Sequence, residues 1–169
     1  MSKDNSLNAS QQRTWLGYMR VYHRLEYEMN RQLLSECGMS LGDYTVMNAL
    51  SNAPQHRAQL SGLAAAVGWE RSRLSHHLQR MVRRGFVDRL PSDTDGRATD
   101  AALTDLGWEA FRSAVPKHAA WVKRLFFSDL NRGQEKALAD ILTTVYETIL
   151  RNGTLPPPDF DEQRPIAAP

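Results

Sequence analysis

Two short helical segments joined by a tight turn, and followed at once by a change of periodicity, constrain the fold of this chain most. Residues 60–68, LSGLAAAVG, predict a short helix whose alanines allow a neighbouring element to approach closely, and Gly68 predicts a turn after it. In residues 70–84 the apolar side chains recur at helical spacing and form one stripe: Leu74, Leu78, Met81 and Val82. Two helices joined by such a turn are typical of a helix-turn-helix.

The sequence after Gly85 has the pattern of strands. Residues 86–90, FVDRL, and residues 98–104, ATDAALT, are short extended segments, and the turn formers PSDTDGR lie between them. We therefore predict a β-hairpin. A helix-turn-helix followed directly by a hairpin is the winged-helix arrangement.

A long helix and a shorter one are predicted before the helix-turn-helix. Residues 11–36 carry apolar side chains at helical spacing, and Gly38 suits the left-handed position that ends a helix. Ser40 and Asp43 resemble a capping box, in which each side chain bonds a backbone N–H group of the other residue. This box predicts a second helix through Leu50.

Two further helices are predicted after the hairpin. Helical periodicity resumes at Thr104, and Pro116 is expected to bend or interrupt it because proline lacks a backbone N–H. A last helix is expected from Asn131, with Gln134 in the third helical position of another capping box.

Composition excludes several classes of protein. A chain of 169 residues, 41% hydrophobic, suits one domain with helical extensions. No apolar run approaches the roughly 18 residues of a membrane span, and the polar N-terminus lacks the features of a signal peptide, so we expect a cytoplasmic protein. The single cysteine cannot form an internal disulfide, and we expect no metal and no cofactor. Residues 1–10 and 153–169 are expected to be disordered.

Positive charge is concentrated in and just after the second helix of the helix-turn-helix. Residues 69–85 contain five arginines and two histidines. From Glu70 to Arg97 seven arginines face four acidic residues, a surplus of three, whereas the net charge of the whole chain is only +2. A solvated helix face would account for such a run, but this asymmetry also fits a protein with one face directed at nucleic acid.

The order of these elements resembles the MarR family of transcription regulators over about residues 11–150. The hairpin is similar to the family's wing signature, which this sequence matches at these positions: Asp95, Arg97, Leu103, Thr104 and Gly107. RSRLSHHLQRM also resembles a recurrent form of the family's recognition helix. The resemblance implies a mainly α fold with a small β-hairpin wing. Residues 37–104 would form the winged helix-turn-helix DNA-binding domain, and residues 11–36 and 105–150 would be dimerisation helices.

The second helix of the helix-turn-helix supplies the candidate DNA contacts. An α-helix fits the major groove, where its N-terminal residues meet base edges and flanking arginines meet phosphates. We predict groove contacts by Ser72, Ser75 and His76, and contacts to both bases and phosphates by Arg71 and Arg73. An intramolecular salt bridge is the alternative for Arg73, which lies beside the apolar stripe. The remaining basic residues would contact the DNA backbone or stay solvated: His77, Arg80, Arg83 and Arg84.

The hairpin loop supplies one more candidate. In the family the wing arginine enters the minor groove, and Arg97 stands at the matching place. Asp95 would then hold that arginine through a charge-assisted hydrogen bond, and an ordinary turn stabilised by the aspartate is compatible with this role.

The terminal helices imply a second subunit. Apolar stripes on an N-terminal and a C-terminal helix cannot both be buried by one small winged domain. The family resemblance implies the same arrangement, a homodimer that binds a palindromic double-stranded operator, and we expect it to act as a repressor. Two-fold symmetry would then place the two recognition helices roughly 34 Å apart.

A small effector is a further expectation. Many relatives bind aromatic or anionic molecules between the dimer helices and the DNA-binding lobe, which biases the separation of the recognition helices. The candidate ligand-binding residues are Trp15, Tyr18, Tyr22, His23, Tyr44, Met47 and His118. For each of them, packing in the dimer core is the alternative.

Other functions have less support in the sequence. Redox sensing through Cys37 is an alternative, although the peroxide sensors of the family place their cysteine near the start of the first helix and no Lys or Arg flanks this one. A winged-helix protein-interaction module would have an apolar outer face on the second helix of the helix-turn-helix. We do not expect an enzyme, because the chain has no Gly-rich phosphate loop, no HExxH and no GxSxG.

Overall fold

The computed structural model describes residues 6–92 and 98–158. Along the chain the elements are α1 (Ala9–Cys37), α2 (Leu41–Asn52), the 3₁₀ turn η1 (Pro54–His56), β1 (Arg57–Gln59), α3 (Leu60–Val67), α4 (Arg71–Arg83), β2 (Val87–Pro91), β3 (Thr99–Leu103), α5 (Asp105–Val122), the π-helical turn η2 (Lys123–Phe127) and α6 (Arg132–Asn152). The fold is mainly α with a small wing, as predicted.

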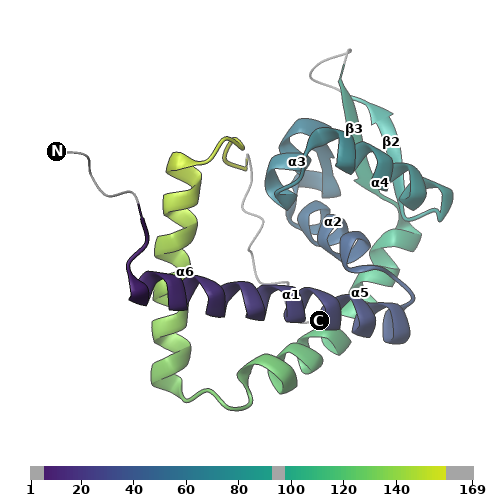
Figure 1. Ribbon diagram of the computed structural model, residues 1–169. Helices are drawn as coiled ribbons and strands as arrows, with labels where there is room; N and C mark the ends of the chain where they lie inside the picture. The colour runs from purple at the N-terminus through teal and green to yellow at the C-terminus, as the bar shows by residue number, and fades with distance from the viewer. Residues whose placement is uncertain (1–5, 93–97, 159–169) are drawn as a thin grey trace.

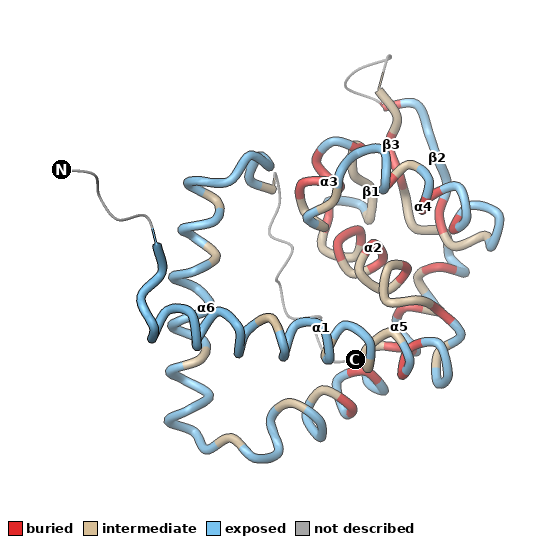
Figure 2. Tube along the Cα trace, in the orientation of Figure 1, coloured by how far each residue is buried: buried red, intermediate tan, exposed pale blue. Residues whose placement is uncertain are grey.

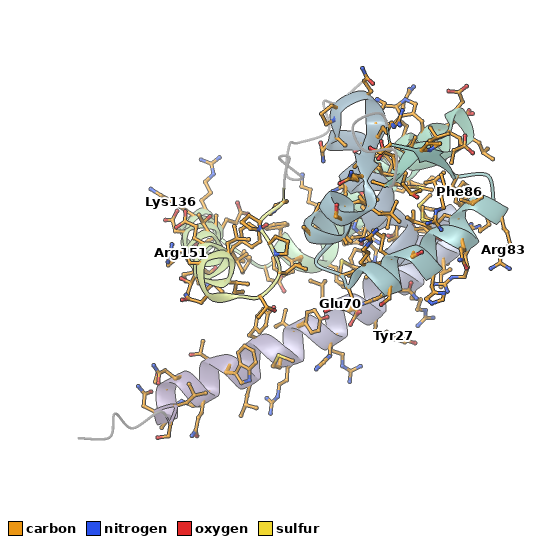
Figure 3. The ribbon with its side chains drawn as sticks, turned by 90° about the horizontal axis from the view of Figure 1, so that it is seen from above. Tyr27, Glu70, Arg83, Phe86, Lys136 and Arg151 are labelled. Carbon is orange, nitrogen blue, oxygen red and sulfur yellow. The ribbon has the colours of Figure 1, made fainter. Side chains whose placement is uncertain are left out.

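The elements form a compact lobe with long helices leading away from it. Helices α2, α3 and α4 and the three strands gather at one end, and we call them the winged lobe (Figure 1). Helix α1 packs on α2 and α5, and α5 leads out of the lobe toward α6. Both ribbon views show α6 standing away from the winged lobe (Figures 1 and 3).

The core lies inside the winged lobe and under the adjoining ends of α1 and α5 (Figure 2). Leu74, Leu78 and Met81 are fully buried there, which confirms the predicted stripe, whereas Val82 is 37% exposed. The other large buried side chains include Leu33, Val46, Met47, Leu50, Leu63, Val87 and Phe111. Helix α6, in contrast, contains no buried residue.

The predicted helix signals are confirmed at three termini. Gly38 ends α1 in the left-handed conformation, with φ of 66°. Ser40 and Asp43 form the capping box of α2, and Asn131 and Gln134 form that of α6.

Two expectations about the helices are wrong in part. Helix α1 begins at Ala9, because Asn8 and Gln11 form a further capping box, so the predicted disorder of residues 1–10 does not hold for residues 9 and 10. Helix α5 continues through Pro116, so the interruption that was one of the two alternatives there does not occur. The change of helical geometry comes later, in η2.

The sheet contains one strand more than the predicted hairpin. Strands β2 and β3 pair antiparallel, and β1 pairs with the other edge of β3, with Arg57 opposite Ala102. The turn into β1 places the non-glycine residues Gln55 and His56 at φ of 56° and 55°, a left-handed conformation that such residues seldom adopt. The ring of His56 stacks on Trp108 of α5, with centroids 4.4 Å apart, and this contact holds the turn.

The junction between the wing and α5 depends on close backbone approach. Thr104 caps α5 by accepting a hydrogen bond from the N–H of Gly107, and its hydroxyl donates to the carbonyl of Gly85. A Cβ atom at Gly107 would lie only 2.0 Å from the carbonyl oxygen of Phe86. A glycine is therefore required where the helix starts beside the strand.

None of the helices in the part of the chain that the structure describes is long and apolar enough to cross a membrane.

Candidate nucleic-acid interface

Helix α4 presents a polar outer face because its apolar stripe is buried. Arg71, Ser72 and His76 are exposed and Ser75 is half-buried. Arg83 is exposed near the end of α4 (Figure 3), with its Nε donating to the carbonyl of Gln79. Glu70 is the N-cap residue of α4, but its side chain accepts no hydrogen bond from the first turn. The positive N-terminal end of the helix is therefore not capped by this carboxylate.

Two arginines of α4 contact aromatic or imidazole groups of their own lobe. The guanidinium carbon of Arg73 lies 4.3 Å from the centre of the Trp69 ring, a cation–π contact in place of the salt bridge that was the alternative for this residue. Arg80 donates from Nη2 to Nδ1 of His77 at 2.9 Å. Both arginines are still exposed.

His77 and Arg84 meet at one buried carboxylate, that of Asp43 on α2. Nε2 of His77 lies 2.9 Å from Oδ1 of Asp43, and Nη1 of Arg84 donates to Oδ2 at 2.7 Å. The expectation that His77 is solvated is wrong, since it is 8% exposed. Arg84 was expected to contact the DNA backbone or to stay solvated, and its ion pair with Asp43 was not predicted.

The electrostatics of Asp43 follow from these contacts. Burial alone would raise the pKa of its carboxyl, but the contact with His77 and the hydrogen bonds from the N–H and hydroxyl of Ser40 outweigh burial and lower the pKa to about 2. Because Arg80 donates to Nδ1, the neutral ring of His77 carries its proton on Nε2, which faces Asp43. The N–H is not well aligned with the oxygen, so this contact is largely electrostatic.

A partly open cavity of about 700 Å³ adjoins this network, between α1 and the winged lobe. Its lining includes Tyr22, His23, Glu26, Tyr27 and Asn30 from α1, Gly42 and Thr45 from α2, Trp69 from the turn before α4, and Arg73, His77 and Arg80 from α4. Gly42 allows the close packing of its wall, because a Cβ there would lie 2.8 Å from Cε1 of His77.

The predicted ligand-binding residues do not meet in one place in this chain. Only Tyr22 and His23 line the cavity. Trp15 and Tyr18 are exposed on α1, where Tyr18 stacks on Tyr22 at 6.2 Å between centroids. Met47 is fully buried in the core.

Tyr44 and His118 form a separate cluster between α2 and α5. Their ring centroids lie 4.7 Å apart, and Nδ1 of His118 is 2.9 Å from Oε1 of Gln32 on α1. Burial raises the pKa of Tyr44 to about 12 and lowers that of His118, so both are neutral at neutral pH.

The sequence analysis did not predict that residues of the winged lobe, among them Trp69 and Arg73, line the cavity. Trp69, in the turn before α4, lies only four residues before Arg73, and this closeness in sequence is a signal that the two side chains could meet. No sequence pattern connects them to Tyr27, because their meeting at one cavity depends on how α1 lies across the lobe.

The tip of the wing, with Asp95 and Arg97, lies outside the described residues. The two wing strands are held together near that loop by Arg57, whose Nε donates to Oδ2 of Asp100 at 2.7 Å and whose Nη2 donates to the carbonyl of Pro91 at 2.6 Å. One side chain of β1 thus joins the two wing strands.

Cys37 is a half-buried free thiol at the end of α1. Burial raises the pKa of this thiol and Glu36 adds to the effect, while Lys117 opposes it. The raised pKa disfavours the reactive thiolate.

Comparison with known proteins agrees with this geometry. The MarR family profile matches residues 38–98. Sco3205, a MarR family transcriptional regulator from Streptomyces coelicolor whose crystal structure is a complex with DNA, is 32% identical, with a TM-score of 0.84 over 93% of this chain and 99% of that one. AbsC, a MarR family regulator from the same organism, is 29% identical, with a TM-score of 0.79 over 88% of this chain and 99% of that one.

A curated relative matches part of the chain. The transcriptional repressor MprA of Escherichia coli K12 is 27% identical over 89 residues, 53% of this chain and 51% of that protein. The match thus spans about half the length of the curated relatives. The winged lobe, the long flanking helices and a likeness that extends along nearly the whole of Sco3205 lead to one conclusion: this chain belongs to the MarR family of transcriptional regulators.

Proposed function

We propose that this protein binds a specific double-stranded DNA operator through α4 and represses transcription from it. The observation that carries this proposal is the polar outer face of α4, with Arg71, Ser72, His76 and Arg83 exposed over a buried apolar stripe. Side chains of these types at the start of a helix can reach base edges, and arginines near its end can reach phosphates. The positive helix N-terminus adds attraction for a phosphate.

The active species that we propose is a homodimer. Helix α6 is 21 residues long and has no buried residue, yet its apolar residues Ile141, Val145 and Ile149 are exposed along it. Leu16 and Val21 on α1 are 59% and 52% exposed. A second copy would bury these stripes, and its symmetry would match a palindromic operator.

Selection from a random duplex pool tests the DNA proposal. The full chain should enrich two inverted half-sites about one helical turn apart. Binding to the enriched duplex should weaken steeply with salt, with a slope of about −0.9 for each phosphate neutralised. Absence of any enriched sequence, or an affinity that is flat with salt, would contradict the proposal.

We further propose that the cavity between α1 and the winged lobe binds an effector with an aromatic body and an anionic group. Tyr22, Tyr27 and Trp69 offer ring surfaces, and Arg73 and Arg80 offer cations. An occupant would touch side chains of α4, so binding would be coupled to the position of the helix.

The probe pair 2-naphthoate and its neutral amide tests the ligand class. The acid should raise the thermal midpoint of the protein and release the enriched duplex, and the amide should do neither. Arg80→Met should weaken the effect of the acid. Release by both compounds to the same extent, or by neither, would contradict an anion-binding cavity.

A further inference from the structure

Asp43 is a single carboxylate that joins α2 to α4 and, through Arg84, to the end of α1. It belongs to α2, where it completes the capping box by accepting from the backbone N–H of Ser40 at 2.9 Å. It contacts α4 and the residue that ends it, through His77 and Arg84. Arg84 also donates to the carbonyl of Gly38 at 2.6 Å, which brings in the end of α1.

The two contacts are spaced so that they fix both the rotation of α4 and its position along its axis. His77 and Arg84 are seven residues apart, which is within about 20° of two full turns and about 10 Å along the axis. They therefore lie on one face of α4, opposite the same point of α2. A rotation or a slide of α4 would separate at least one of them from the carboxylate.

The remaining contacts of α4 restrain it less specifically. Leu74, Leu78 and Met81 hold one face of α4 against the core by apolar contact. Apolar contact favours burial of that face but has no preferred direction. The hydrogen bond from Arg84 to Asp43 is charge-assisted, and such bonds are short and directional. The contacts of Arg84 and His77 with Asp43 are also shielded from water on the side of Asp43, whose side chain is 5% exposed.

We propose that Asp43 is a positioning residue for DNA reading, which sets the orientation of the outer face of α4 by holding His77 and Arg84. The proposal rests on the DNA-reading role of α4 proposed above. Ser72 and His76 lie on the same rigid helix, so a turn of α4 moves the groups that would meet base edges while its phosphate-contacting arginines remain near the backbone.

Asp43→Asn tests this role. The amide keeps the size of the side chain, and its oxygen in the place of Oδ2 can still accept from the N–H of Ser40. The negative charge that pairs with Arg84 is lost, and the NH₂ in the place of Oδ1 faces Nε2 of His77, which also carries a proton. We expect the ratio of affinities for the enriched and a scrambled duplex to fall about tenfold, with little change in scrambled binding or in its salt slope. Amide hydrogen exchange in α4 should accelerate, while exchange in α5 stays as in the wild type.

Gln32→Ala is the matched control. It removes the buried partner of His118 and touches α1 and α5 but not α4. We expect it to lower the thermal midpoint and keep the ratio between the two duplexes. If Asp43→Asn keeps the ratio, or reduces it only as far as Gln32→Ala does at an equal loss of stability, the positioning role is wrong.

Arg84→Met provides a second variant that does not depend on the folding of Asp43→Asn, because the Arg84 side chain is 41% exposed. It should reproduce the fall of the ratio, and the double variant should fall no further than either single variant. Additive effects would overturn the proposal. If the wild type binds the enriched and the scrambled duplex equally well, the proposed function fails. In that case amide hydrogen exchange still tests the positioning role, which is wrong if exchange in α4 of Asp43→Asn is the same as in the wild type.

Discussion

At the scale of single residues, the arginines of α4 and its C-terminal end separate into two kinds by what their guanidinium groups touch. Arg71 and Arg83 lie on the exposed face, as the sequence predicts. Arg84 pairs with a carboxylate 41 residues away. The helical period predicts which side of α4 a residue occupies, but it contains no information about which distant acid lies opposite that side.

The residues that we propose to read bases should affect specificity. His76→Ala or Ser75→Ala removes a polar partner for a base edge but no fixed cation, so each should cost about 1–3 kcal/mol on the enriched duplex and little on a scrambled one. Titrations of both duplexes at three salt concentrations measure this. Equal effects on the two duplexes would show that α4 does not read the bases.

Arg83 and Arg84 should behave differently, although the sequence groups them. Arg83→Ala should weaken both duplexes by similar factors and make the salt slope shallower by up to about one unit for each phosphate that is no longer neutralised. Arg84→Ala should instead lower the thermal midpoint, because it removes a cation that pairs with the buried Asp43. The same titrations and a thermal melt separate the two variants, and identical behaviour in both assays would be inconsistent with the ion pair.

Acid should weaken the fold through Asp43. The pKa of this carboxyl is about 2 in the folded protein and about 4 when unfolded, so its contribution is fully present above about pH 4 and is lost as the pH falls toward 2. The difference corresponds to about 2 kcal/mol. Urea unfolding of the wild type and Asp43→Asn between pH 5 and 2 should show a smaller acid-induced destabilisation in the variant, and parallel curves would argue against the lowered pKa.

At the scale of elements, the sequence predicts those whose signals are local. The capping boxes of α2 and α6, the apolar stripe of α4 and the hairpin can each be identified from neighbouring residues. Strand β1 could not be predicted, because three residues show no periodicity and its pairing depends on β3, more than 40 residues later. The run of α5 through Pro116 also depends on packing, since local chemistry favours a break there.

The start of α5 should tolerate no side chain at Gly107. Gly107→Ala places a Cβ against the carbonyl of Phe86, so the helix or strand must shift, at a cost of about 1–3 kcal/mol or more. Gly17→Ala in α1 is the control, because a Cβ there meets no atom within 4 Å and alanine favours the helix. Chemical denaturation measures both, and a Gly107→Ala protein as stable as the wild type would refute the close approach.

At the scale of the whole molecule, the apolar faces of α1 and α6 remain exposed in the single chain. Their periodicity is visible in the sequence, which therefore predicts a second subunit. The cavity is harder to predict from the sequence, because its walls come from α1, α2 and α4 and it forms only when these helices have packed.

Charge in the α6 stripe should prevent assembly. Val145→Asp places a carboxylate where we expect the partner copy, so sedimentation should show a monomer, and operator affinity should fall at least about a hundredfold because a monomer engages only one half-site. Thr143→Asp, on the opposite side of α6, should remain dimeric. A dimeric Val145→Asp protein would place the interface elsewhere.

The carboxylate of Asp43 also has an evolutionary consequence. One acid that satisfies donors on two neighbouring elements makes positions 43, 77 and 84 interdependent, because a change at one leaves a buried charge or an unused donor at the others. In an alignment of related regulators we therefore expect these three positions to covary, and lineages in which position 43 is uncharged should have an apolar or uncharged residue in place of Arg84.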